Sequence, residues 1–360
     1  MRARYLLVSC LALLCMVAGS AFAGWTVVNL NPAGAIWSHA IGVSGGQQVG
    51  SMGYASLWSG TAASWVNLTP AGATHSDAMG VSDGRQVGCA TIGGYGHAGL
   101  WSGTAGSWED INPAGADYSI AFGVSGGRQV GYAGIGGNPH AGLWSGTAGT
   151  WVDLHPAGVS QSEAYGVSGG QQVGYAYTGG HHAALWSGTA ASWVDLNPAG
   201  ATESFAYGVS SGQQVGYANP GGGPFHAGLW SGTAASWVDL NPLVATGSNA
   251  YGVSGGQQVG RAYIGGKYRA SLWSGTAASW VDLHSLMPSS RWYAYSCARS
   301  IDVSGADIWV AGYAYNTSSY EDNAILWHYT ADPVPEPSSF LALAGGLGML
   351  LGFRRRVSPK

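Results

Sequence analysis

One segment of about 43 residues recurs along nearly the whole chain and constrains its fold more than any other feature. Its central motif, GVSGGQQVG with small changes, begins at Gly42, Gly80, Gly123, Gly166, Gly208 and Gly252. The companion motif LWSGT places tryptophans at positions 58, 101, 144, 186, 230 and 273. A more divergent seventh copy, DVSGADIWVAG, begins at Asp302 and is followed by Trp327. A fixed period of this length indicates a repeat architecture.

Each repeat predicts four short antiparallel strands. In the copy at 164–196, alternation and turn chemistry predict strands at 164–168, 171–177, 183–186 and 192–196. A Gly-Gly pair suits the tight hairpin between the first two strands, and SGTAA turns the chain between the last two. Four such strands per repeat are typical of a propeller blade. We therefore predict an all-β fold, a seven-bladed β-propeller of four-stranded blades.

The strand count also predicts how the ring closes. The last repeat ends at HYTADP without a fourth strand, whereas WTVVNL at residues 25–30 precedes the first repeat. We expect this N-terminal strand to complete blade seven, because an unpaired sheet edge would otherwise remain exposed.

Composition changes sharply at both ends of the repeats. Residues 1–23 carry Arg2 and Arg4, an apolar stretch and an Ala-Phe-Ala site, the pattern of a secretory signal peptide. The propeller is expected over 24–332 and a separate tail over 333–360. Cys89 and Cys297, the cysteines left after the signal, fall in blades two and seven, so a disulfide between them is not expected.

Charge excludes one class of partner. Residues 24–334 contain 7 Lys and Arg against 16 Asp and Glu, a formal net charge of −9. Nucleic-acid binding needs a basic surface, so no nucleic-acid partner is expected.

Three recurring residue types invite a chemical interpretation. The GVSGG serines match a nucleophile motif, but they precede strands rather than helices, which favours turn serines. The repeated His-Ala histidines lack a metal-ligand spacing, and we interpret them as hydrogen-bonded structural residues. The repeating tryptophans are interpreted as core packing. No cofactor or metal is therefore expected, and the chain is predicted not to be an enzyme.

The tail has an ordered series of motifs. It carries Pro335, Glu336 and Pro337, then an apolar run over 338–353, and then Arg354, Arg355 and Arg356. This layout resembles the PEP-CTERM sorting signal of Gram-negative bacteria that make exopolysaccharide. The resemblance implies a transmembrane sorting helix at 338–353, transient anchoring in the inner membrane, and processing by an exosortase-type membrane enzyme. It implies a secreted or cell-surface protein.

The repeats themselves resemble the HAF extracellular repeat. The resemblance rests on the GVSGGQQVG units and on His-Ala at His97, His140, His182 and His226, each followed by Leu-Trp after one residue. Tyr54, Arg269 and Asn323 take the histidine position in other repeats. The resemblance implies an extracellular repeat protein and supplies no catalytic residue.

Ligand-binding candidates are residues that depart from the repeat. Most basic residues of the body fall between 261 and 299, interleaved with aromatic residues. The candidates are Lys267, Tyr268, Arg269, Arg291, Trp292 and Arg299. Cations beside aromatic rings suit acidic sugars.

Three functions stay open. The first is an exported, non-enzymatic interaction module of the cell surface or extracellular matrix, associated with exopolysaccharide. The second is a lectin-like propeller that binds carbohydrate. The third is a polysaccharide lyase or hydrolase, for which Asp77, Glu163 and Glu203 lie near blade entries without forming an evident pair.

Overall fold

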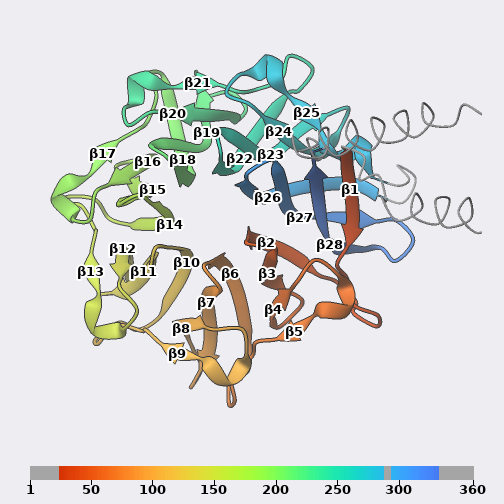
Figure 1. Cartoon of the computed structure of the whole chain (residues 1–360). Coiled ribbons are helices and arrows are strands. Elements are labelled where there is room, and N and C mark those ends of the chain that lie inside the picture. The colour runs from red at the N-terminus through yellow and green to blue at the C-terminus, as the bar shows by residue number, and fades with distance from the viewer. Residues whose placement is uncertain (1–23, 288–292, 332–360) are drawn as a thin grey trace, which may run out of the picture. The chain divides into compact units, whose positions relative to one another are not determined.

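The computed structural model describes residues 24–287 and 293–331, in which seven four-stranded blades surround a central opening (Figure 1). This confirms the predicted seven-bladed β-propeller. Blade one contains β2 to β5, the next five blades follow in chain order, and blade seven contains β26 to β28 with β1.

Within a blade, the strands follow one another from the central axis to the rim. The innermost strands are β2 (His39–Ser44), β6 (Ser76–Ser82), β10 (Ser119–Ser125), β14 (Ser162–Ser168), β18 (Ala201–Ser210), β22 (Gly247–Ser254) and β26 (Tyr293–Ser304). The second strands are β3 (Gln47–Ser51), β7 (Arg85–Ile92), β11 (Arg128–Ile135), β15 (Gln171–Tyr177), β19 (Gln213–Pro220), β23 (Gln257–Ile264) and β27 (Asp307–Asn316). The third strands are β4 (Ala55–Trp58), β8 (Tyr95–Trp101), β12 (Asn138–Trp144), β16 (His181–Trp186), β20 (His226–Trp230), β24 (Lys267–Trp273) and β28 (Glu321–Thr330). The outer strands are β5 (Val66–Asn67), β9 (Glu109–Asp110), β13 (Val152–Asp153), β17 (Val194–Asp195), β21 (Val238–Asp239), β25 (Val281–Asp282) and β1 (Gly24–Asn29).

The N-terminal strand closes the ring as predicted. β1 lies beside β28 as the outer strand of blade seven. The Leu30 amide donates to the Ala324 carbonyl at 2.8 Å, and the Thr26 hydroxyl donates to the His328 carbonyl at 3.2 Å. The last blade therefore holds segments from both ends of the repeat region.

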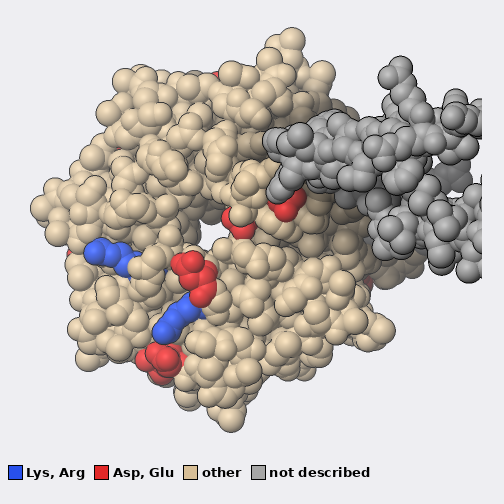
Figure 2. Space-filling view, viewed as in Figure 1, with Lys and Arg blue, Asp and Glu red and all other residues tan. Residues whose placement is uncertain are grey.

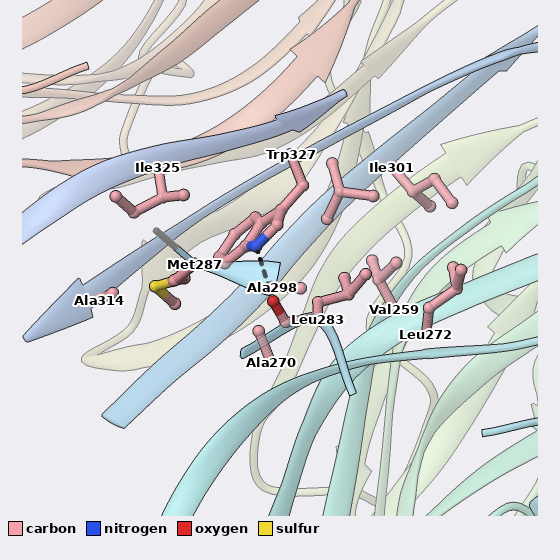
Figure 3. Packing of buried hydrophobic residues seen from close by; sticks show 11 residues of the cluster. Val259, Ala270, Leu272, Leu283, Met287, Ala298, Ile301, Ala314, Ile325 and Trp327 are labelled. Atoms are coloured by element: carbon pink, nitrogen blue, oxygen red, sulfur yellow. Dashed lines mark hydrogen bonds between the residues drawn. The ribbon is translucent and has the colours of Figure 1, made fainter. Parts of the chain in front are cut away.

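The core lies between blades rather than within them. Seven clusters of buried apolar residues fill the seven interfaces. Each contains one LWSGT tryptophan or its equivalent, all fully buried. Figure 3 shows the interface of blades six and seven, where Trp327 packs near Leu283 and donates from Nε1 to its carbonyl at 3.0 Å. The prediction that these tryptophans are core residues is confirmed.

A buried serine also joins each blade to the next. The Ser162 hydroxyl on β14 accepts a hydrogen bond from the Ala141 amide on β12 at 3.0 Å. The same bond occurs at Ala55–Ser76, Ala98–Ser119, Ala183–Ser204, Ala227–Ser248, Ala270–Ser296 and Ala324–Ser38. In four interfaces this serine also donates to the asparagine of the preceding Asn-Pro, at 2.6 to 2.7 Å. The crossing residues therefore help to fix one blade against another.

The outer strands of blades one to six are shorter than predicted, with two residues each. Instead of a strand over 192–196, a one-turn 3-10 helix, η4 (Ala190–Ser192), precedes the two-residue β17. The Ser192 hydroxyl donates to the Thr189 carbonyl at 2.6 Å and accepts from the Ser187 amide at 2.8 Å, which tightens this turn. The same one-turn helix recurs as η1 (Ala62–Ser64), η2 (Ala105–Ser107), η3 (Ala148–Thr150), η5 (Ala234–Ser236) and η6 (Ala277–Ser279). A different 3-10 helix, η7 (Leu283–Leu286), follows β25.

The register of blade seven differs from the sequence alignment. Gly252 pairs with Val259 and sits at a β-bulge on β22, whereas the equivalent bulge on β26 places Ser300 opposite Ala311. The sequence motif aligned Asp302 with Gly252, but the structural equivalent of Gly252 is Ser300, two residues earlier in the chain. The hairpin of blade seven is correspondingly longer on both strands.

Two predicted segments lie outside the described residues: the signal peptide at 1–23, and the tail at 333–360 with its helix at 338–353. Within residues 24–287 and 293–331, no helix is both long and apolar enough to span a membrane. Cys89 and Cys297 are both free and buried, and burial raises the pKa of Cys89 to about 12.

Candidate functional site

The antiparallel order of the strands gives the propeller two different faces. The Gly-Gly hairpins and the SGTAA turns lie on one face, and the remaining hairpins and the blade crossings lie on the other.

Within a blade, a buried glutamine joins the Gly-Gly hairpin to the SGTAA turn. The Gln172 side chain donates to the Gly170 carbonyl at 2.8 Å and accepts from the Gly188 amide at 2.7 Å, and five other blades repeat this arrangement. We call the opposite face, with its differing loops, the variable face.

A groove of ≈ 710 Å³ lies on the variable face between blades five and six. Its aromatic lining comes from two blades: Phe205, Tyr217, Phe225, Tyr263 and Tyr268. Phe225 follows the Gly-rich loop of blade five, and its ring contacts Tyr217 edge-to-face at 5.1 Å between centroids. The longer loop of blade five therefore adds the Phe225 ring to the aromatic surface of the groove.

Polar groups lie at two places in this groove. The guanidinium carbon of Arg261 lies 4.0 Å from the centroid of the Tyr268 ring, and its Nε donates to the Asn249 side chain at 3.1 Å. The His181 Nδ1 and Glu203 Oε1 atoms lie at hydrogen-bond distance, 3.0 Å apart. The groove thus combines apolar ring faces with a cation, a carboxylate and an imidazole.

The groove continues toward blades seven and one. A second hollow shares Arg261 and Tyr268 with the first and is lined further by Tyr295, Tyr313 and Asp322. A third hollow shares Tyr295 and Asp322 with the second and reaches Trp37 and His39. The Tyr295 and Tyr315 rings stack at 5.2 Å. We call these three linked hollows the aromatic groove.

The structure separates the predicted ligand-binding residues. Tyr268 lines the aromatic groove, and Lys267 is exposed at the start of the same strand. Arg269 instead pairs with Asp282 of the neighbouring outer strand. Arg299 lines the central channel.

The other predicted residues fall outside the part of the chain that the structure describes. These are Arg291 and Trp292, together with Pro335, Glu336, Pro337, Arg354, Arg355 and Arg356.

Sequence reasoning missed most of the groove. Phe205, Tyr217, Phe225 and Tyr295 were not candidates, although all four line it. One signal was available, because Phe205 stands where other repeats carry Asp77, Ile120 or Glu163. This position, directly after the buried serine on the innermost strand, differs from blade to blade. The variation distinguishes it from the positions that repeat with the core.

The His-Ala histidines are hydrogen-bonded to the outer strands. His97, His140, His182 and His226 each contact an aspartate, namely Asp110, Asp153, Asp195 and Asp239, at 2.7 to 2.9 Å. Among residues 24–287 and 293–331, no group of three or more His, Cys, Asp or Glu side chains is placed to hold a metal ion.

The three carboxylates considered for catalysis have separate partners. Asp77 contacts His75 at 2.9 Å and Glu203 contacts His181. Glu163 accepts a hydrogen bond from the Tyr175 hydroxyl at 3.0 Å and another from Tyr165. Burial raises the pKa of Glu163 above its ordinary value of 4.5, while these two hydrogen bonds act in the opposite direction.

Comparison with known proteins adds information on the fold. No family model matches the sequence, and no curated protein matches it significantly. Puromycin hydrolase is similar in structure, with a TM-score of 0.52 and 12% identity over 84% of this chain and 56% of that one. The β-propeller domain of the Trilobed protease from Pyrococcus furiosus has a TM-score of 0.50 and 8% identity, covering 81% of this chain and 95% of that one. TolB from Acinetobacter baumannii has a TM-score of 0.42 and 14% identity, covering 71% and 62%.

The strand topology defines the class of protein. The chain is a seven-bladed β-propeller, and it spans just over half the length of puromycin hydrolase. At such low identity the likeness concerns the fold alone.

Proposed function

We propose that this chain is an exported, non-enzymatic interaction module that binds extracellular polysaccharide along the aromatic groove. The observation that carries the proposal is the convergence of Phe205, Tyr217, Phe225 and Tyr268 beside Arg261 and the His181–Glu203 pair. Binding sites combine a largely apolar lining with a few placed polar groups. A sugar ring has an apolar C–H face for stacking on aromatic rings and hydroxyl groups for such polar partners.

The extent of the groove favours a polymer over a single sugar. Three hollows follow one another through shared residues, from His181 near one end to Trp37 near the other. A chain of sugars would place successive rings against successive aromatic side chains. Arg261 supplies a cation at the junction of the first two hollows, which suits a uronic acid at that position.

The carboxylates support binding without cleavage. Hydrolysis of a glycosidic bond uses two carboxyl groups about 5–9.5 Å apart on either side of the bond. In the aromatic groove, Glu203 is engaged by His181 and Asp322 by His39. Glu321 lines the same hollow as Asp322, but the two are adjacent on β28, and adjacent strand residues point to opposite faces of a sheet.

Export is proposed from the ends of the chain. The signal peptide at 1–23 and the PEP-CTERM-like tail at 333–360 together suit a protein that crosses the inner membrane and is then processed by an exosortase-type enzyme. The mass of the mature chain isolated from the native host tests this step. A mature protein that still carries Arg354 to Arg356 would contradict processing.

A glycan array tests the binding function. The mature wild type is expected to retain a subset of polysaccharides, with uronic-acid polymers bound more tightly at low salt. Tyr268→Ala is expected to weaken binding about tenfold, the effect of losing about 1.4 kcal/mol. Tyr95→Ala provides the matched control, because Tyr95 is 61% exposed on the corresponding hairpin of blade two and lies outside the groove.

Two results would refute the proposal. If Tyr95→Ala and Tyr268→Ala lowered the affinity for polysaccharide equally, the aromatic groove would not be the binding site. Release of new reducing or unsaturated ends from a bound polysaccharide would favour the lyase or hydrolase alternative.

A further inference from the structure

A second cavity occupies the central channel. It has a volume of ≈ 440 Å³ and is lined by residues at and beside the β-bulge of each innermost strand. Its walls include Val81, Val124, Val167, Val209, Val253 and Ile301, one from each of blades two to seven. Figure 2 shows that the described surface is hollowed at the centre of the ring, with acidic side chains beside the opening.

The residue skipped by the pairing at the bulge of each innermost strand lines this cavity. In blade order these residues are Ile41, Met79, Phe122, Tyr165, Tyr207, Tyr251 and Arg299. The lining is therefore aliphatic on one side and aromatic on the other, with one cation. The Tyr165 and Tyr207 rings stack at 4.7 Å with 2° between their planes.

Arg299 is the one charged residue in the lining. Its guanidinium carbon lies 4.4 Å from the centroid of the Tyr251 ring. Within residues 24–287 and 293–331, no carboxylate forms an ion pair with it. A cation in such an apolar cavity attracts an anion more strongly than one in water does.

Two of the three tyrosine hydroxyls in the lining, those of Tyr165 and Tyr207, have partners of their own. Tyr207 and Tyr217 hydroxyls lie 3.0 Å apart, and Tyr165 bonds Glu163. The guanidinium of Arg299 hydrogen-bonds the Cys297 side chain and is the one cation among the described residues that line the cavity. Planar guanidinium groups bind carboxylates through two parallel hydrogen bonds.

We propose that the channel binds a small apolar carboxylate, with its carboxylate on Arg299 and its apolar body against the tyrosines and valines. The volume lies within the usual range of about 300–1,000 Å³ for small-molecule sites. Tyr251 stands between Arg299 in the channel and Arg261 in the aromatic groove, whose guanidinium carbon lies 5.8 Å from the same ring. The channel site is therefore separate from the proposed polysaccharide site and does not depend on it.

Isothermal titration calorimetry on the mature chain tests the channel site, with sodium 4-phenylbutyrate as the probe and 4-phenylbutan-1-ol as its neutral analogue. We expect the carboxylate to bind about 10- to 100-fold more tightly than the alcohol, because hydrogen bonds between charged groups are the stronger ones. The Arg299→Gln variant should bind the carboxylate about 10- to 100-fold more weakly than the wild type does. Arg128→Gln replaces an exposed arginine on the Gly-Gly hairpin of blade three and should bind like the wild type.

A second variant tests the location independently of Arg299. Val167→Phe adds volume to the channel wall and should also weaken binding of the carboxylate at least about tenfold. The comparison of acid with alcohol on the wild type needs no variant at all. Equal affinity for the two compounds, no binding of the carboxylate to the wild type, or undiminished binding in a folded Arg299→Gln protein would each overturn the proposal.

Discussion

The Ser38 hydroxyl accepts a hydrogen bond from the Ala324 amide at 2.9 Å, although 286 residues separate the two. The same serine donates to the Asn31 side chain at 2.7 Å. The bond from a backbone amide to a buried serine recurs in the six interfaces between blades that are consecutive in the chain, and the bond to asparagine recurs in three of them. The ring therefore closes with the same contacts that hold its other blades together.

A second contact reinforces the closing interface. The Asp302 carboxylate, on the longer hairpin of blade seven, accepts a hydrogen bond from the Gly45 amide of blade one at 2.8 Å. On the other side, the Val303 amide donates to the Ser254 hydroxyl of blade six at 3.1 Å. The extended hairpin thus contacts both neighbouring blades.

Deletion of residues 24–31 should destabilise the whole propeller. The deletion removes β1, the buried Leu30 side chain and the Asn31 contact to Ser38, and it exposes the edge of β28. We expect a large fall in melting temperature together with aggregation, measured by calorimetry and size-exclusion chromatography. A deletion variant as stable and monomeric as the wild type would refute closure by this strand.

Ser38→Ala and Ser162→Ala should lower the free energy of unfolding by the same amount. Each serine is fully buried and bonds a backbone amide of the preceding blade, so its loss leaves that amide unpaired. We expect about 1–3 kcal/mol in each case from chemical denaturation. A clearly smaller cost for Ser38→Ala would show that the closing interface is weaker than the internal one.

Gly166→Ala should destabilise the ring at its axis. A Cβ at Gly166 would lie 2.7 Å from the Tyr207 carbonyl oxygen of the next blade, and backbone at that contact has little room to move. A loss of more than about 1 kcal/mol is expected from overpacking. Gly149→Ala in η3 is the control, since a Cβ there meets nothing within 4 Å and should be neutral or slightly stabilising. Equal melting temperatures for the two variants would contradict this packing.

Trp327→Phe should cost more than Trp144→Phe. Both side chains are fully buried, but only the indole N–H of Trp327 has an acceptor, the Leu283 carbonyl, whereas that of Trp144 has none among the described residues. The loss of ring volume is the same in both variants. Because Trp327→Phe also removes the hydrogen bond to Leu283, it should lower the free energy of unfolding by about 0.5–1.5 kcal/mol more than Trp144→Phe does. Denaturant titration of the pair gives the difference directly.

Glu163→Gln should change the pH dependence of stability. Because burial raises the pKa of Glu163 in the folded state, its stabilising contribution is present below about pH 4.5 and is lost as pH rises through the folded-state pKa. The melting temperature of Glu163→Gln relative to wild type should therefore rise between pH 4 and pH 8. Glu109→Gln, which removes an exposed carboxylate from β9, controls for the change in net charge. A constant difference across this range would contradict the assignment.

The repeat period by itself determined the architecture. Gly-Gly hairpins, LWSGT turns and the 43-residue interval specify strands and turns through local hydrogen bonding, which a sequence displays directly. The unmatched strand at 25–30 also indicated how the last blade is completed. These features depend on neighbours in the chain, and the structure confirms them.

Tertiary structure alone decided which side chains converge. Arg269 and Arg299 belong to one basic stretch of the sequence, yet Arg269 pairs with Asp282 on an outer strand and Arg299 lies in the channel. Whether a strand residue faces the channel depends on a β-bulge, which shifts the register by one residue, as on β26. The aromatic groove forms because Phe205 and Tyr268 come from different blades, and the packing of blade five against blade six brings the two residues together.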